Sequence, residues 1–225
     1  MATKTVNRIS ELDGNGNGNG HKVKAKPAPE PKALQIVIPE MNLIRTKITL
    51  VGDSPLVMHK WSEKARGMML SKQTGEARQA REKKDPKQDY EDAIYYIRKA
   101  EKGKPAIYGF PAIAFKSAAV DACSHVAGIT KVLARGAFHI PCELVTIEGT
   151  PEMVEHMVRV GMGTADIRFR PMFREWRTTF EIVINERVLT VAQIVNLFNT
   201  AGFAIGVGEH RPEKNGSWGM FSVRV

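Results

Sequence analysis

The C-terminal run from Ala201 to Val225, AGFAIGVGEHRPEKNGSWGMFSVRV, places cations among closely spaced glycines. Glycine lets a backbone approach a ligand closely, and Lys or Arg beside it suits a phosphate group. A solvated, glycine-bearing β-hairpin explains the run equally well, because Asn215-Gly216 is a turn signal. Trp218 either stacks on a base or packs under the hairpin. The candidate nucleic-acid contacts in this run are His210, Arg211, Lys214 and Trp218.

A second candidate segment lies between Ala165 and Arg177, where arginines are interleaved with Phe and Trp. This mixture supplies cations for phosphates and rings for bases, the two contacts that sequence-tolerant binders of single strands use. A loop whose aromatic side chains fill the core gives the same pattern. The residues assigned here to nucleic-acid binding are Arg168, Arg170 and Arg174, and Lys60 is a further candidate.

Lys116 is a third candidate, because it is expected in the first turn of a helix that Pro111 opens. A lysine at that place opposes the helix dipole, whereas the free backbone N–H groups there favour an anion. An anionic partner would explain the lysine, and a solvated helix residue is the alternative. Ser117, the next residue, is included in the same candidate contact.

The sequence gives little support for a metal or a catalytic centre. Two close pairs have ligand-like spacing, His139 with Cys142 and Cys123 with His125. Pro141 bends the strand expected for the first pair, whereas tight zinc pairs usually lie on turns. No Ser-His-Asp spacing is apparent, and residues 161–163 are too short for a dinucleotide fingerprint. We expect no metal, no cofactor and no catalytic residue.

Charge and composition favour a polyanion as partner. The chain has 225 residues, a formal net charge of +9 and a pI near 9.6. Such a balance suits nucleic acid and does not specify a fold. Two cysteines make no disulfide framework, which indicates a reducing compartment. No apolar run reaches membrane-spanning length and the N-terminus has no signal-peptide core, so we expect a cytoplasmic protein without a membrane partner.

Composition predicts a leader and one domain. Residues 1–33 are rich in Gly and Asn and then in Lys and Pro, so we expect a disordered basic leader. Residues 34–225 are expected to form a single domain with an insertion at about 56–104. Ser71 to Lys87 within the insertion is basic and poor in apolar residues, and it is interpreted as a mobile surface excursion.

Periodicity predicts an α+β fold. The strand expected first, Ile44–Val51, alternates apolar and polar residues, and Thr190 is expected to cap a helix that ends near Thr200 and is closed by Gly202. Without the insertion, the order is strand, helix, strand, strand, helix, strand, which is the ferredoxin-like (RRM-like) order with two helices on one face of an antiparallel sheet. The elements are Ile44–Val51, Phe115–Val126, Phe138–Ile147, Thr178–Ile184, Val191–Thr200 and a C-terminal strand in a glycine-rich hairpin.

Other segments are less regular. Asp85-Pro86 is expected to open a helix that Gly103 ends, and Ala106–Phe110 is a short strand. Val154–Met162 is ambiguous between strand and helix, and Ala165–Arg177 is expected to be irregular.

Three segments together resemble the RAMP superfamily, in particular the backbone (Cas7-like) subunits of CRISPR effector complexes. KITLVGDSPLV, from Lys47 to Val57, is similar to the opening strand and its Ser-Pro-Leu-type turn. GFPAIAFKSAA, from Gly109 to Ala119, resembles a Pro-containing loop that leads into a helix with a basic residue near its start. GVGEHRPEKNGSWGM, from Gly206 to Met220, resembles the glycine-rich loop near the C-terminus.

The resemblance implies RNA-backbone binding by identical subunits stacked head to tail, with other effector-complex subunits as further partners. Lys116 then matches the basic residue of the helix, and Arg211 and Lys214 match the cations of the glycine loop. The insertion would stand over the guide RNA. Family members that cut RNA use an acidic residue after the first strand. Asp53 lies nearest, but its surroundings do not match, so nuclease activity is not carried over.

Three functions remain open from the sequence. The first is a non-catalytic, self-assembling binder of single-stranded nucleic acid, with RNA as the first choice. The second is a RAMP-type endoribonuclease, and the third is a phage or plasmid recombination protein that coats single-stranded DNA. Phosphate contacts do not read the sugar, so RNA and DNA are not distinguished.

Overall fold

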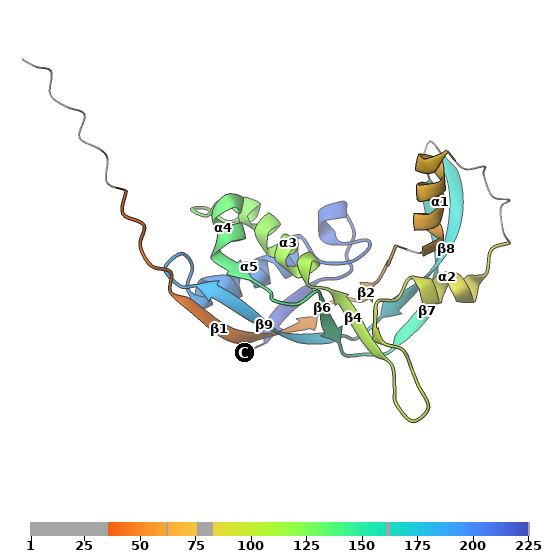
Figure 1. Ribbon diagram of the computed structural model, residues 1–225, viewed down its shortest axis with the longest axis horizontal. Helices are drawn as coiled ribbons and strands as arrows, with labels where there is room; N and C mark the ends of the chain where they lie inside the picture. Colours follow the sequence, from red (N-terminus) through yellow and green to blue (C-terminus); the bar gives the residue numbers. More distant parts are fainter. Residues whose placement is uncertain (1–35, 62, 76–82, 161–162, 225) are drawn as a thin grey trace, which may run out of the picture. The chain divides into compact units, whose positions relative to one another are not determined.

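The computed structural model describes residues 36–61, 63–75, 83–160 and 163–224 (Figure 1). The chain divides into two units, Met1–Pro39 and Glu40–Val225, and every helix and strand described here belongs to the second. The expected leader, residues 1–33, lies outside the described residues, and so does the middle of the expected surface excursion, residues 76–82.

A four-stranded antiparallel sheet in the order β10–β1–β9–β5 lies at the centre of the second unit. Its strands are β1 (Leu43–Gly52), β5 (Phe138–His139), β9 (Arg177–Asn185) and β10 (Phe221–Arg224). β1 and β9 pair from Leu43↔Asn185 to Val51↔Arg177. The alternation predicted for the first strand is confirmed, because Ile48 and Leu50 are buried whereas Arg45 and Lys47 are exposed.

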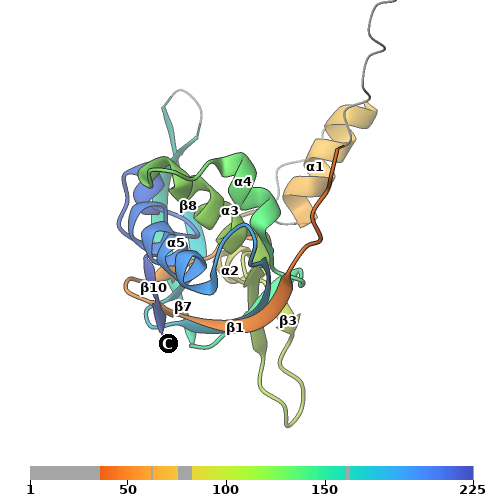
Figure 2. The same ribbon diagram turned by 90° about the vertical axis from the view of Figure 1, so that its left-hand side faces the viewer.

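Helices cover one face of this sheet (Figures 1 and 2). They are α3 (Ala112–Ala122), the 3₁₀ turn η1 (Cys123–His125), α4 (Lys131–Ala137) and α5 (Val191–Ala204). The predicted cap of α5 is confirmed: Thr190 and Gln193 form a capping box, which satisfies two N–H groups at the helix start. Between helices and sheet lies an aromatic core in which Phe115 and Phe198 contact Phe180.

Two smaller antiparallel sheets extend the domain. One has the order β2–β8–β7, with β2 (Leu56–Val57), β7 (Pro151–Val160) and β8 (Thr164–Phe173). The other has the order β3–β4–β6, with β3 (Tyr96–Arg98), β4 (Ile107–Pro111) and β6 (Leu144–Ile147). The expected insertion also carries α1 (Glu63–Thr74) and α2 (Pro86–Asp92), and the turn η2 (Pro212–Lys214) lies near the C-terminus.

The prediction of an irregular segment at Ala165–Arg177 is wrong. Most of it forms β8, which pairs with β7 from Pro151↔Phe173 to Val160↔Thr164. The period of two is present in Asp166-Ile167-Arg168-Phe169-Arg170, with Ile167 and Phe169 on one face, so the segment does carry the alternation of a strand. The burial departs from that pattern, because Arg170 is 3% exposed whereas Ile167 is 46% exposed. The same pairing resolves the ambiguous segment that begins at Val154 as a strand.

Two other expected elements are shorter than predicted. The helix that Asp85 caps ends at Asp92, because the following Tyr95-Tyr96-Ile97 run favours a strand, and Tyr96 pairs with Tyr108. The expected strand over Phe138–Ile147 is divided into β5 and β6. Pro141 lies in the break, where it cannot donate a ladder hydrogen bond.

The predicted C-terminal hairpin is also wrong in its first half. Ala201–Ala204 is the last turn of α5, and β10 pairs with β1 instead of with a neighbouring strand. Gly202 does not close the helix but lies inside it, where an added Cβ would come 1.7 Å from the backbone oxygen of Phe221. The side chain of Asn199, one turn earlier, accepts a hydrogen bond from the Val223 N–H at 2.8 Å. Gly202 therefore lets α5 lie directly against β10.

We expect Gly202→Ala to lower the free energy of unfolding by about 1–3 kcal/mol, because the new methyl group collides with backbone that cannot move alone. Gly67→Ala is the matched control, since nothing lies within 4 Å of its added Cβ on α1. That control should gain about 0.5–1 kcal/mol from helix propensity. Urea denaturation of both variants tests this, and equal stability of the two would contradict the close packing of α5 on β10.

Candidate nucleic-acid interface

One face of the β7–β8 hairpin brings together two of the three predicted arginines. Arg168 and Arg170 lie two positions apart on β8, so they share a face, and the cross-strand partner of Arg168 is His156. Arg174 follows the end of the strand and does not join them. It is exposed, and its Nε lies 2.6 Å from a carboxylate oxygen of Glu152.

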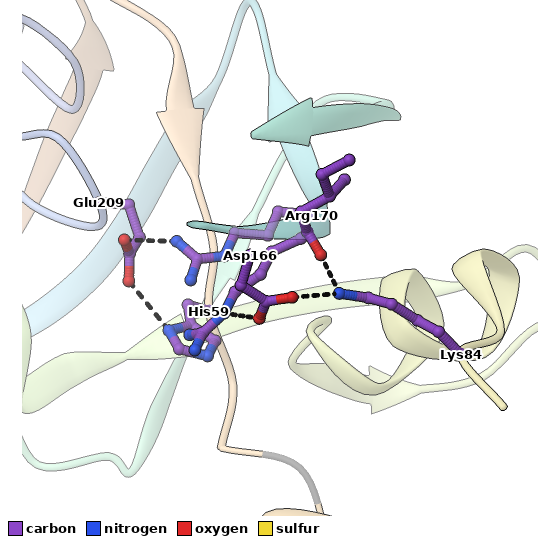
Figure 3. A network of polar contacts seen from close by, with 7 residues as sticks. His59, Lys84, Asp166, Arg170 and Glu209 are labelled. Atoms are coloured by element: carbon purple, nitrogen blue, oxygen red, sulfur yellow. Dashed lines mark hydrogen bonds and ion pairs between the residues drawn. The ribbon is translucent and has the colours of Figure 1, made fainter. Parts of the chain in front are cut away.

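Arg170 is the most buried of these cations, with 3% of its side chain exposed, and it forms an ion pair with Glu209 (Figure 3). The other carboxylate oxygen of Glu209 accepts a hydrogen bond from His59 Nδ1 at 2.9 Å. The Glu209 N–H donates to the Val57 carbonyl at 3.1 Å. One glutamate thus joins β8, the segment after β2 and the glycine-rich loop.

The charge state of Glu209 follows from these contacts. The hydrogen bond from His59 and the charge of Arg170 hold the pKa of Glu209 at about 2, although burial acts in the opposite direction. The carboxyl group is therefore ionised at neutral pH and can accept from both Arg170 and His59.

A second polar group occupies the outer part of the same hairpin face. Lys84 Nζ lies 2.8 Å from Asp166 and also donates to the Ile167 carbonyl, while Arg168 Nε donates to Asp166 at 3.2 Å (Figure 3). The hydrogen bond from Lys84, followed by that from Arg168, lowers the pKa of Asp166 despite some opposing desolvation. Arg168 therefore has a partner within the chain, which a phosphate would have to replace.

Between these two groups lies a hollow of about 200 Å³, which we call the cation-lined hollow. Lys60 lies on it without an ion-pair partner among the described residues, and Trp61 presents a ring that is 56% exposed. The Nε of the buried Arg170 has no hydrogen-bond partner in the described part of the chain. The residues that define the hollow are Lys60, Trp61, Asp89, Asp166, Arg168 and Arg170.

The glycine-rich loop adds a cluster of rings on the hairpin. Trp218 stacks on His156 with ring centroids 5.1 Å apart, and His210 meets both rings edge to face at 4.9 and 5.4 Å. Burial lowers the pKa of His156, and the charges of His210 and Arg170 lower it further, whereas Glu209 raises it. Of the two alternatives for Trp218, the geometry favours packing on the hairpin, because one face of its ring is already covered.

The two predicted cations of the glycine loop differ in their availability. Arg211 is held by Glu213, with Nε and Nη2 at 2.9 and 2.6 Å from the same carboxylate oxygen, and its Nη1 donates to the Gly208 carbonyl. Lys214 is 64% exposed and 4.0 Å from Glu213. Lys214 is therefore free to approach a phosphate, whereas Arg211 fixes the shape of the loop.

Lys116 does not lie where the sequence predicted. α3 begins at Ala112, so Lys116 is in its second turn, away from the unpaired N–H groups of the helix start. Its Nζ lies 3.0 Å from His139 Nδ1 and 5.8 Å from the centre of the Phe138 ring, and burial lowers its pKa. Ser117 is exposed on the same helix. The helix-dipole argument for an anion at this place no longer holds, and neither residue lines the cation-lined hollow.

Sequence reasoning missed several residues that build the interface: His59, Trp61, Lys84, His156, Asp166 and Glu209. A signal was present for two of them, His59 and Trp61, because His59-Lys60-Trp61 combines basic residues with a ring as the arginine-rich segment does. Glu209 gave none, since its partner His59 is 150 positions away in the chain.

The cysteines do not form a metal site with their neighbouring histidines. Cys123 is buried and its thiol points to the Ala119 carbonyl, whereas Cys142 is exposed. Within the described ranges, no group of three or more His, Cys, Asp or Glu side chains is placed to hold a metal ion. Among the helices that the structure describes, none has the length and hydropathy needed to cross a bilayer.

The chain matches no protein-family model and no curated protein. Among solved structures, it is similar to the crystal structure of Cmr6 from Pyrococcus furiosus, with a TM-score of 0.39 and 11% sequence identity. The match covers 82% of this chain and 100% of that one. At this degree of likeness, the match does not decide between functions.

The Glu209 contacts predict an acid-sensitive stability. Because the folded-state pKa is about 2 and the ordinary value is 4.5, the stabilisation is complete above pH 4.5 and is lost as the pH falls towards 2. We expect Glu209→Gln to be less stable than the parent by about 2 kcal/mol at neutral pH, with a difference that shrinks across this window. Urea midpoints measured from neutral to acid pH test this.

Glu152→Gln is the control, since it removes a carboxylate from the exposed pair with Arg174 and should change stability by at most about 1 kcal/mol. A constant difference between Glu209→Gln and the parent at all pH values would contradict the assigned role of Glu209.

Proposed function

We propose that this protein is a non-catalytic binder of single-stranded nucleic acid, RNA in the first place, that assembles along the strand. The observation that carries the proposal is the cation-lined hollow. There Lys60, which has no ion-pair partner in the described part of the chain, and the buried Arg170 line the same hollow as the exposed ring of Trp61. Cations with a neighbouring ring are what sequence-tolerant binding requires, because every nucleotide offers a phosphate and a π-face.

The carboxylates of Asp89, Asp92 and Asp166 line the hollow, but they are outnumbered there by the cations of Lys60, Lys84, Arg168 and Arg170. Asp166 already partners Lys84 and Arg168, but these side chains are between a third and a half exposed. Such pairs are worth roughly 0–1 kcal/mol, whereas charge-assisted hydrogen bonds to phosphate are stronger. A phosphate can therefore replace Asp166 at small cost, and Lys60 has no ion-pair partner among the described residues to give up.

The open face of the central sheet is a less suitable site. Its outward residues on β1 include Arg45 and Lys47, and Arg45 is paired with Glu181 at 2.6 Å. The outward positions of β1, β9 and β10 in the described sheet carry no aromatic ring. That face offers phosphate contacts without base stacking, which sheets that bind RNA ordinarily provide.

We further propose that the domain is ferredoxin-like and related to the RAMP superfamily. Support comes from the sheet order β10–β1–β9–β5 with α3 and α5 on one face. The three segments that resemble the superfamily fall on β1–β2, on β4–α3 and on the loop between α5 and β10.

Nuclease activity remains the second candidate, and Asp53 is the acidic residue nearest to the family position. Its carboxylate accepts a hydrogen bond from Ser222 at 3.0 Å, and its N–H donates to the Met220 carbonyl. These contacts hold the start of β10 and support a structural role. The third candidate, a single-stranded DNA-coating protein, differs from the first only in the sugar of its ligand.

We expect Lys60→Ala and Lys214→Ala to weaken binding to all sequences alike and to reduce the log–log salt slope by about 0.7 each, the contribution of one phosphate contact on a single strand. Fluorescence anisotropy with RNA and DNA strands of equal length measures this. Lys102→Ala, in the exposed β3–β4 connection, is the control.

An unchanged salt slope in a variant that combines Lys60→Ala with Lys214→Ala would contradict phosphate binding at these two lysines. The RNA should be recovered intact with and without a divalent metal. Cleavage that is lost on changing one acidic residue would instead establish the nuclease.

We expect long single strands to give filaments or helical oligomers, because a heterologous contact that does not close forms an open helix. The α1 helix of the insertion carries three consecutive exposed apolar residues, Met68, Met69 and Leu70, which suit a contact with a neighbouring copy. The double variant Met69→Glu, Leu70→Glu should fold normally and bind with lower cooperativity.

Electron microscopy and binding titrations test this assembly. Val132→Glu is the matched control, since Val132 is 75% exposed on α4. Discrete monomers of the parent protein on a long strand, without cooperativity, would refute the stack.

A further inference from the structure

Lys60 lines a second, larger cavity as well as the cation-lined hollow. This cavity has a volume of about 460 Å³ and lies between the β3–β4–β6 sheet and the start of α3. We call it the tyrosine groove and define it by Lys60, Tyr95, Tyr96, Ile113, Glu143 and Leu144. Apart from Lys60, the residues that line this groove are different from those that line the cation-lined hollow, so the groove is a separate feature.

The two tyrosines of the groove are held in place by the surrounding structure. The Tyr96 hydroxyl donates to Glu91 at 2.8 Å, and the strand pairing sets its ring 5.7 Å from that of Tyr108. The Tyr95 ring meets Phe110 edge to face at 6.0 Å. Fixed rings lose little conformational entropy when a ligand binds, so they are suited to contact one.

Ile113 adds an apolar wall that is 65% exposed, although it lies on the first turn of α3 beside core residues. An exposed apolar side chain that lines the same cavity as two tyrosines is typical of a ligand site.

The two cavities differ in volume, and the tyrosine groove is the one with more room for a base. Ligand cavities commonly span about 300–1,000 Å³, a range that includes the tyrosine groove and excludes the hollow of about 200 Å³. Lys60 is common to both, so a phosphate held there has one neighbouring nucleotide beside the groove. The flat apolar face of a base fits walls made of tyrosine, isoleucine and leucine.

We propose that the tyrosine groove binds one unpaired base of the strand whose phosphate contacts Lys60, and that Glu143 selects a base with an exocyclic amino group. This inference rests on the proposed single-strand binding. The Glu143 carbonyl accepts a hydrogen bond from the Ala112 N–H at 2.9 Å, which fixes its backbone beside the start of α3. Its exposed carboxylate only accepts hydrogen bonds, and cytosine offers it an exocyclic amino group where uracil has a carbonyl, so that uracil donates through N3–H alone.

The first test compares oligo(C) with oligo(U) of equal length, two pyrimidines that differ at this group. We expect oligo(C) to bind about three- to tenfold more tightly, the effect of one hydrogen bond to a charged acceptor. Glu143→Ala should abolish the ratio. Glu101→Ala removes an exposed carboxylate outside the groove lining and should leave the ratio unchanged. Equal affinities of the parent for the two strands overturn the selectivity of Glu143.

The second test uses Cys142, an exposed thiol in the lining of the groove, while Cys123 is buried. Alkylation by N-ethylmaleimide, followed for each cysteine by mass spectrometry, should slow at Cys142 when oligo(C) saturates the protein. Inorganic polyphosphate, which carries charge without bases, should not slow it.

The two proposals fail in different ways. Strong, salt-dependent binding of oligo(C) without protection of Cys142 overturns the groove as a base site and leaves the proposed function in place. Absence of binding to any single strand overturns both.

Discussion

The ion pair between Arg170 and Glu209 is the contact on which the candidate interface depends. Arg170 is almost wholly buried, and Glu209 is 31% exposed. Loss of one partner would leave a buried charge without compensation, which is among the most destabilising changes available to a protein. Because Glu209 also binds His59, the pair holds the glycine-rich loop and the segment after β2 against one hairpin. Lys60, Trp61 and the ring cluster lie on or next to the segments that this contact joins, and the Lys60 N–H also donates to the Ala93 carbonyl at 3.0 Å.

The overall charge of the chain gives an incomplete account of its binding surface. Several arginines that the sequence marks as phosphate contacts are held by carboxylates: Arg170 by Glu209, Arg168 by Asp166 and Arg211 by Glu213. These side chains chiefly give the surface its shape. The cations that remain available for a phosphate are lysines. Lys60 lies in the cation-lined hollow, and Lys214 is exposed on the glycine-rich loop. This division of roles agrees with the pre-organised fork of Arg and the mobile point charge of Lys.

Local signals explain how much of the fold the sequence predicted. Thr190 and the alternation of β1 act over a few residues, so the cap of α5 and the buried face of β1 could be read directly. β8 also alternates, but its burial could not be read in this way, because Arg170 is buried by a pair with the distant Glu209 whereas Ile167 is 46% exposed. The candidate site was predicted incompletely because its contacts join distant segments. Glu209 forms a hydrogen bond with His59, which is 150 positions away in the sequence, and no pattern in either segment indicates the other.

The outer strands of the central sheet have a consequence for how copies of this chain can associate. β5 is only two residues long and β10 only four. On β10, Asn199 accepts the hydrogen bond of an N–H that a further strand would otherwise use. Short or covered edges of this kind discourage the addition of a foreign strand. If copies of this chain associate as proposed, they would therefore meet through side chains and not through a shared ladder. Such contacts can part again, and edges of this kind oppose amyloid-like growth.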